Sequence, residues 1–305
     1  MAGRRRCGTS WTSAVSTERE ALTARAPDLP GFEQESRSWR FFDLSYADGV
    51  EQAALTEALL TSVARGARPV LRVYSWSEPT VYIGVGERAT DVDRHRCEAL
   101  GVPIVRRLSG GTAVRHDRQW VSVELIARTG APQVPSDVLG ANRAFAVPIA
   151  AGLARLGVVT HTVAIEEARA RTPDPDLAAA CFGSLAPYEL VSRGRKLVGL
   201  AQVRKLGAAV LHAAIGLRFD VAALATVLAD VDHTFEGHLA ATVTDLRQET
   251  RRSIDAVDLT ECVRQAFVEF LSHQLEPEMP TTLELASADR LADQKYRDPA
   301  WTFRR

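Results

Sequence analysis

The sequence predicts an α+β fold in which helices flank a mixed, mostly antiparallel sheet. The main observation is the stretch 188–219, where Gly194 and Gly207 separate three apolar segments in the pattern of a hairpin meander. Elsewhere, strand-like and helix-like segments do not alternate as regularly as a parallel, doubly wound sheet requires. Beyond Val221 the chain becomes more polar and its apolar residues take helical spacing.

Apolar periodicity places the individual elements. Before the meander, strands are expected at 39–45, 70–76, 80–85, 102–108, 120–127 and 157–165. Helices are expected at 48–66, 91–100, 137–156 and 254–275, with a loop or short helix at 166–180. Asp48 is the expected N-cap of the first helix, Gly66 and Gly101 are expected helix ends, and Pro148 is a candidate kink.

Length and composition are those of a globular protein. The 305 residues are 46% hydrophobic and 25% charged, and the net charge of −1 excludes a general polyanion binder. We expect a poorly ordered arm at 1–36, a catalytic core at 37–220 and a C-terminal helical region at 221–305, packed on the core. No apolar run reaches the roughly 20 residues that span a bilayer, and the basic N-terminus lacks the apolar segment of a signal peptide. A cytoplasmic protein is expected.

The four cysteines do not form a metal or disulfide pattern. Cys7, Cys97, Cys181 and Cys262 are far apart and include no C-x-x-C pair. Cys97 falls on an amphipathic helix and is expected to pack as a small apolar residue. The seven histidines also form no metal-ligand pattern, so no metal site is predicted.

The segment RRLSGGTAVRHD (106–117) is the first that suggests chemistry. A Ser-Gly-Gly turn between two strands exposes backbone N–H groups, so an acyl chain or a phosphate can approach the main chain closely. Arg106, Arg107 and Arg115 are expected to surround it with positive charge. Taken alone, the segment is equally compatible with an ordinary β-turn that has solvated arginines.

Two further segments lie beside the predicted hairpin. In GRKLVGLAQVR (194–204), Lys196 stands between apolar residues, where a buried ammonium needs a carbonyl, phosphate or thiolate partner. In ACFGSLAPYELV (180–191), Cys181 precedes the same hairpin. If that loop folds back, the ammonium would lower the pKa of the thiol and create a nucleophile. Alone, Lys196 also fits a surface hairpin.

Together these segments resemble the biotin/lipoate protein ligase superfamily. RRLSGGTAVRHD is similar to its R-R-x-[ST]-G-G-x-A-V-x-H-D signature, and GRKLVGLAQVR…LHAAI is similar to its second signature, in the same order. The ending KYRDPAWTFRR also resembles that of the ligases, so the resemblance covers roughly residues 39–305. It implies the fold of class II aminoacyl-tRNA synthetases and biotin–lipoate ligases. Within the superfamily, the pattern most resembles the cysteine-dependent, ligase-like octanoyltransferases.

That resemblance implies an acyltransferase that places an octanoyl or lipoyl group on a lysine of lipoyl-domain carrier proteins. Cys181 would form the thioester, Lys196 would orient the acyl carbonyl, and no cofactor would be needed. Acyl carrier protein would be the donor, and 2-oxoacid dehydrogenase subunits and the glycine cleavage H protein would be acceptors; no nucleic acid or membrane partner is implied. The implied substrate-binding residues are Arg107, Ser109, Gly110, Gly111, Thr112, Ala113, His116, Gly199, Ala201 and His212.

Three alternatives stay open at the level of sequence. An ATP-dependent lipoate–protein ligase would use ATP and Mg²⁺, although ligases tend to have Arg where this chain has Val85. A non-catalytic relative is suggested by three departures from the family pattern, at Thr112, Leu200 and Ala213. A nicotinamide enzyme is suggested by G-x-G-x-x-A at 84–89 with Arg106 and Arg107 downstream.

Overall fold

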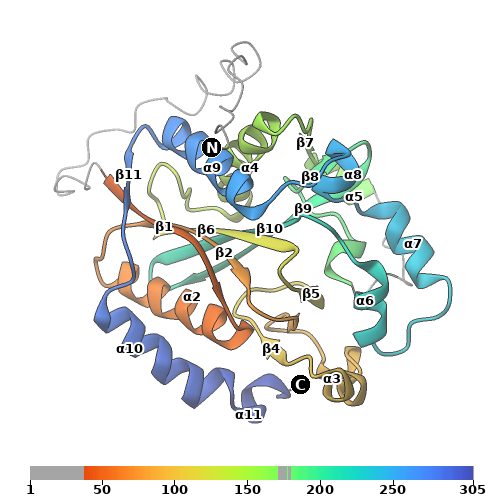
Figure 1. The fold of residues 1–305 in the computed structure, drawn as a ribbon. Helices are drawn as coiled ribbons and strands as arrows, with labels where there is room; N and C mark the ends of the chain where they lie inside the picture. Colours follow the sequence, from red (N-terminus) through yellow and green to blue (C-terminus); the bar gives the residue numbers. More distant parts are fainter. Residues whose placement is uncertain (1–37, 171–176, 178–179, 305) are drawn as a thin grey trace, which may run out of the picture.

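In the computed structural model, which describes residues 38–170, 177 and 180–304, an eight-stranded sheet forms the centre of the molecule (Figure 1). Its strand order is β11-β1-β2-β6-β10-β9-β8-β7. β1 is parallel to β11 and to β2, and the five remaining pairings are antiparallel. The predicted mixed, mostly antiparallel sheet is therefore confirmed. The expected arm at 1–36 lies outside the described residues.

The elements that surround the candidate site come from the first two thirds of the chain. The strands are β1 (Ser38–Ala47), β2 (Val70–Trp76), β3 (Thr80–Ile83), β4 (Ile104–Arg106), β5 (Val114–His116), β6 (Trp120–Arg128), β7 (His161–Thr162), β8 (Leu190–Ser192), β9 (Arg195–Lys205) and β10 (Ala208–Gly216). The helices are α2 (Gly49–Ala64), α3 (Arg94–Leu100), α4 (Val138–Arg155) and α5 (Ile165–Ala170), with short 3₁₀ turns η1 (Ala89–Asp91) and η3 (Cys181–Gly183). β3, β4 and β5 form a separate three-stranded sheet.

Local sequence signals explain where several elements begin and end. Asp48 caps α2 in a complete capping box with Glu51. Gly101 ends α3 in the left-handed region, as expected of a helix C-terminus. The helix α4 runs through Pro148 from its N-cap Asp137. The meander β8–β9–β10 turns at Gly194 and Gly207, both with positive φ.

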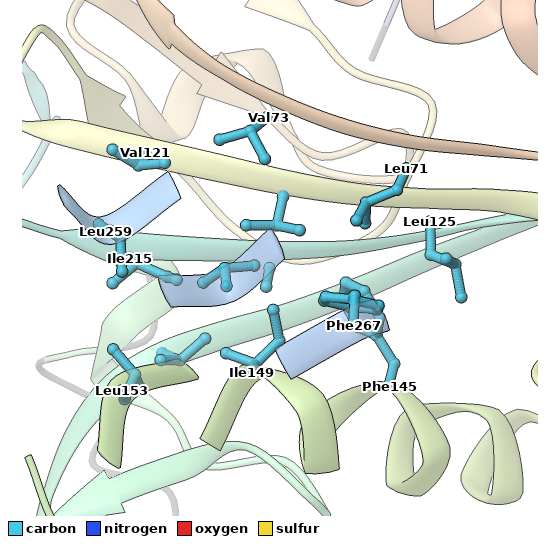
Figure 2. Close-up of a cluster of buried hydrophobic side chains, with 14 of the residues drawn as sticks. Leu71, Val73, Val121, Leu125, Phe145, Ile149, Leu153, Ile215, Leu259 and Phe267 are labelled. Atoms are coloured by element: carbon cyan, nitrogen blue, oxygen red, sulfur yellow. The ribbon is translucent and has the colours of Figure 1, made fainter. Parts of the chain in front are cut away.

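The largest of the buried hydrophobic clusters among the described residues lies between the sheet and the helices α4 and α9 (Ala256–Leu271). Figure 2 shows side chains of the strands, such as Leu71, Val121 and Ile215, facing Phe145 and Ile149 of α4 and Leu259 and Phe267 of α9. Full burial of one such side chain is worth about 1.5–3 kcal/mol. The opposite face of the sheet is covered by α2 (Figure 1).

The C-terminal region returns to the N-terminal half of the chain. It contains α6 (Val221–Val227), α7 (Phe235–Thr242), α8 (Leu246–Thr250), α9, β11 (Gln274–Pro277), α10 (Thr282–Leu291), the π-helix η4 (Ala292–Tyr296) and α11 (Pro299–Thr302). Glu57 of α2 accepts from Lys295 at 2.6 Å and from Tyr296 at 2.9 Å. Trp301 Nε1 donates to the carbonyl of Arg106 at 2.9 Å. The end of the chain thus braces β4, the strand that leads into the Gly-rich turn.

Two features differ from the sequence expectations. The strand expected at 157–165 is reduced to His161–Thr162, because this segment pairs only with β8 at the exposed edge of the sheet. The region 221–305, expected to be helical, also supplies β11, which pairs with β1 between Ser38 and Phe41. A four-residue strand with the sequence QLEP lacks the alternation that would identify it.

Candidate active site

A cavity lies between the α2-covered face of the large sheet and the small β3–β5 sheet. The space inside it, together with the open solvent at its mouth, is about 760 Å³. Six of the predicted binding residues line it: Arg107, Ser109, His116, Gly199, Ala201 and His212. Leu200, Val203, Val210 and Ala214 add apolar surface. The structure therefore brings the two sequence signatures together around one largely apolar cavity.

The strand register arranges the cavity wall in rows. Gly199 is paired with Ala214 in the first row, Ala201 with His212 in the second and Val203 with Val210 in the third. Neighbouring rows are two residues, or about 7 Å, apart along the strands. An extended acyl chain parallel to β9 would pass these rows in turn, starting at Gly199.

Lys196 borders the Gly199 end of this cavity. The side chain is buried, with 1% of the residue exposed, which excludes the surface hairpin that the sequence left open. Its ammonium lies 2.8 Å from Glu189 Oε1, donates to the carbonyl of Ser184 at 3.0 Å and lies 4.9 Å from the centre of the Phe182 ring. A Cβ on Gly199 would be 3.5 Å from Lys196 Cε. A carbonyl, one of the three kinds of partner expected for a buried ammonium here, is present, and Glu189 is a further partner that the sequence pattern did not indicate.

Cys181 begins the 3₁₀ turn η3. Its side chain is outside the described part of the structure, so the predicted proximity of its thiol to Lys196 stays a prediction. The residues on either side of Cys181 contact both the Gly-rich segment and the aromatic residues beside the cavity. Ala180 forms a parallel bridge with Ala113 of the Gly-rich segment, and the Phe182 ring packs on Trp120 and Phe219, with ring centres 5.1 and 5.6 Å away.

The backbone of the Gly-rich turn is held by the neighbouring loop at Gly84 and by the side chain of Arg107. Gly111 has φ of +93°, which an L side chain rarely adopts. Gly84 of the neighbouring loop lies so close that a Cβ there would overlap the Gly111 carbonyl. The Arg107 guanidinium donates to the carbonyls of Gly110 at 2.8 Å and Thr112 at 3.0 Å. Within the described chain, the cavity wall contains Ser109 of this turn but not Gly110, Gly111, Thr112 or Ala113.

The positive charge expected around this turn is largely used inside the protein. Arg106 is fully buried and donates to the carbonyls of Gly84, Glu87 and Thr302 at 2.7–2.8 Å. Arg115 is paired with Asp117 at 2.8 Å. The expectation that three arginines surround the turn with positive charge was therefore wrong for Arg106 and Arg115, because both bind local acceptors. The nicotinamide alternative assigned Arg106 and Arg107 to a phosphate, whereas Arg106 is buried against backbone carbonyls.

His116, which the resemblance implies as a substrate-binding residue, lines the cavity but makes no hydrogen bond to the Gly-rich turn. Its imidazole is buried among the rings of Trp76, Tyr82 and Trp120, with the nearest ring centre 4.2 Å away at Trp76. Neither ring nitrogen has a hydrogen-bond partner among the described residues. Burial holds the pKa of His116 well below its usual range, so the ring is neutral at physiological pH.

A buried polar cluster crosses the cavity wall at the second row. Glu124 is paired in register with His212 and Arg72. Its carboxylate accepts from Tyr74 and Thr56 at 2.9 Å and lies 3.4 Å from Arg72 Nη1. Burial raises the pKa of Glu124, while Arg72 opposes this rise. This cluster could not be recognised from the sequence, because alternating polar residues in a strand normally indicate the solvent-facing side of a sheet.

His212, predicted to bind substrate, has an identified partner. Its Nε2 lies 2.7 Å from Ser122 Oγ, and its ring stacks on Tyr74 with centres 6.4 Å apart. Burial lowers the pKa of His212 to about 3, with smaller contributions from Arg107 and Arg72. The neutral imidazole therefore forms part of the cavity wall without adding a charge.

Cys97 is buried, as expected, and burial raises its pKa to about 11, so it is a poor nucleophile. Residues 38–170, 177 and 180–304 contain no group of three or more His, Cys, Asp or Glu side chains placed to hold a metal ion. None of the helices described is long and apolar enough to cross a membrane.

Comparison with known proteins defines the family. Residues 48–268 match the family model of the lipoyl protein ligase A/B catalytic domain. Octanoyltransferase LipM of Kyrpidia tusciae is 34% identical over 280 residues, which cover 88% of this chain and all of that protein. Octanoyltransferase LipM of Exiguobacterium sibiricum is 30% identical, with 88% and 99% covered. The chain therefore belongs to the lipoyl protein ligase A/B family, and the predicted superfamily is confirmed.

Solved structures agree on the fold. A lipoate-protein ligase A bound with ATP superposes with a TM-score of 0.72 at 22% identity, covering 87% of this chain and 98% of that one. A bi-partite lipoate protein ligase from Thermoplasma acidophilum, described with its E2 lipoyl domain, gives 0.70 at 21% identity, covering 89% and 97%. The predicted biotin–lipoate ligase type of fold is thus confirmed.

Proposed function

We propose that this protein is an octanoyltransferase that moves an octanoyl group from acyl carrier protein, through a thioester on Cys181, to a lysine of a lipoyl-domain protein. The observation that carries the proposal is the buried ammonium of Lys196. It borders one end of an apolar cavity and contacts the segment that begins with Cys181. Relatives that match the chain over most of its length are named octanoyltransferases, which supports the same reaction.

In the first step, the Cys181 thiolate attacks the carbonyl carbon of the octanoyl thioester. The new C–S bond forms as the bond to the carrier's sulfur breaks, and the carrier thiolate leaves and takes up a proton. The Lys196 ammonium stabilises the negative charge that develops on the carbonyl oxygen. One well-placed donor of this kind contributes roughly 3–4 kcal/mol to the transition state.

In the second step, the amine of the acceptor lysine attacks the enzyme thioester. An amide forms, the C–S bond to Cys181 breaks and the amine proton is released. Apolar cavity residues such as Val203 and Val210 would hold the C8 chain, at about 0.8 kcal/mol for each buried methylene group. These steps need no cofactor.

The alternative is an ATP-dependent ligase that activates free lipoate as its adenylate. It is supported by the similarity of the fold to that of an ATP-bound ligase, although the sequence identity between the two chains is only 22%. In that reaction Cys181 would have no covalent role. The two candidates therefore differ in whether an acyl group is ever attached to the enzyme.

Intact mass spectrometry after incubation with octanoyl acyl carrier protein tests the proposal. We expect a gain of one octanoyl group on the wild type and on Cys97→Ser, a matched control whose thiol is buried. Cys181→Ser and Lys196→Ala should show no gain. If the wild type gains no mass and Cys181→Ser still attaches lipoate to a lipoyl domain with ATP, the ligase alternative holds and the transferase proposal fails.

A further inference from the structure

The Glu189 carboxylate joins three separate parts of the candidate site. Its Oε1 lies 2.8 Å from the Lys196 ammonium and accepts from the backbone N–H of Leu200 at 3.1 Å. Its Oε2 accepts from the N–H of Ala186 at 2.8 Å. One side chain therefore fixes the lysine, the strand that carries it and the segment that follows Cys181.

The backbone is shaped to bring this carboxylate inward. Tyr188, just before it, has φ of +69°, a left-handed conformation that non-glycine residues adopt at a cost. Two backbone hydrogen bonds with Val163 hold this bend. Tyr188 N donates to the carbonyl of Val163 at 2.8 Å, and Val163 N donates to the carbonyl of Glu189 at 2.9 Å. The register between β8 and β9 also shifts between Leu190 and Val191. Strain of this kind persists where the surrounding structure fixes a functional geometry.

The Cys181 segment and Lys196 are linked a second time. The ammonium donates to the carbonyl of Ser184, and its charge lies over the ring of Phe182. Residues 182, 184 and 186 are thus each attached to Lys196 or to Glu189. Because Cys181 is bonded directly to Phe182, the placement of its backbone depends on this set of contacts.

Fold stability alone does not account for such a pair. The side chains of Lys196 and Glu189 are 2% and 4% exposed. Apolar residues of similar volume commonly replace a buried ion pair without loss of stability. A lysine and a glutamate at this place therefore indicate a requirement for a fixed ammonium beside the Cys181 segment.

We infer that Glu189 is a positioning residue that holds the Lys196 ammonium and the Cys181 segment in one geometry. It does not touch the acyl group; it acts through the two groups that do. The inference rests on the proposed function for its catalytic consequence. The geometry that it describes is a property of the folded protein and can be measured without any acyl donor.

The test compares Glu189→Gln and Glu189→Asp with the wild type. The first measurement is the rate at which iodoacetamide alkylates Cys181, followed by peptide mass spectrometry. The second is the single-turnover rate of octanoyl-adduct formation over a range of donor concentration. Glu57→Gln is the matched control, because Glu57 is also a buried carboxylate paired with lysines but lies on α2 and contacts the C-terminal region.

In Glu189→Gln, we expect iodoacetamide to alkylate Cys181 at least about tenfold more slowly than in the wild type. The octanoyl adduct should form more slowly by the same factor, with the KM for the donor nearly unchanged. Glu189→Asp should recover part of both rates. Glu57→Gln should have a lower thermal stability, but its Cys181 should be alkylated at the wild-type rate. Wild-type alkylation and adduct rates in folded Glu189→Gln would overturn the inference.

A charge-balanced variant covers the case in which Glu189→Gln does not fold. Glu189→Gln combined with Lys196→Met removes both charges, and it is compared with Lys196→Met alone. We expect slower Cys181 alkylation in the double variant, because the contacts to Ala186 and Leu200 are also weakened. Equal rates would overturn the role of Glu189 in placing the segment. A wild type that forms no octanoyl adduct would sink only the proposed function, since alkylation does not depend on it.

Discussion

Phe182 lies directly over Gly199, so that a Cβ on Gly199 would come within 3.1 Å of Phe182 Cζ. The same ring lies 4.9 Å from the Lys196 ammonium and 5.1 Å from the Trp120 ring. The absence of a side chain at 199 thus allows the Cys181 segment to close against β9 beside the cavity. This contact leads to the first prediction.

Gly199→Ala should displace the Phe182 ring and slow octanoyl-adduct formation. A crowded contact of this type typically costs about 1–3 kcal/mol of stability, measured by thermal unfolding. Gly237→Ala is the control, because no atom lies within 4 Å of a Cβ there and its helix should gain about 0.5–1 kcal/mol. Unchanged stability and adduct rate in Gly199→Ala would show that Phe182 moves away freely.

The two glycines of the Gly-rich turn should behave differently. A Cβ on Gly110 meets no heavy atom within 4 Å, so Gly110→Val should change stability by less than about 0.5 kcal/mol. Its KM for the donor should rise if substrate passes over the turn. Gly111→Ala should lose about 1–2 kcal/mol, because its φ of +93° strains an L residue. A normal KM for Gly110→Val would make this turn purely structural.

Lys196→Arg should lose most of its octanoyl-adduct formation, although the positive charge is kept. Glu189 and the carbonyl of Ser184 bind a compact ammonium at this site. A planar guanidinium needs more acceptors and more space than this buried position provides. We expect at least a tenfold slower adduct formation, about 1.4 kcal/mol in the barrier, together with a lower Tm. Activity near that of the wild type would mean that Lys196 serves only as a source of charge.

Glu87 should make stability depend on pH. Burial raises its pKa to about 7, against the hydrogen bond that it accepts from Gly84 N at 2.7 Å. The folded state therefore keeps a proton that the unfolded state loses above about pH 4.5. Stability from this group is present below pH 4.5 and is lost as the pH rises to about 7, by at most about 1.4 kcal/mol per pH unit.

Glu87→Gln removes this titration. The difference in Tm between the variant and the wild type should therefore be more favourable to the variant at pH 8 than at pH 5. The comparison is best made by calorimetry in buffers of equal ionic strength. A difference that is the same at both pH values would contradict a raised pKa for Glu87 in the folded protein.

Much of the fold is visible in local sequence patterns because the signals are strong and short in range. The strand predicted at 70–76 coincides with β2, and the meander turns where Gly194 and Gly207 permit positive φ. The weak strand β11 could not be predicted, because it is defined by pairing with β1, more than 230 residues away. Its four residues carry no periodicity of their own.

The same division applies to the site. The sequence by itself determined which chemical groups are available: a Gly-rich turn, a lysine between apolar residues and a cysteine before the same hairpin. The tertiary structure alone decided how they are used. It placed Arg106 inside the protein, left His116 among aromatic rings and aligned Glu124 with Arg72 across the sheet. Above all, the left-handed turn at Tyr188 brought Glu189 to Lys196. Side-chain partners of this kind depend on register and backbone twist, which non-local packing sets and residue identity does not record.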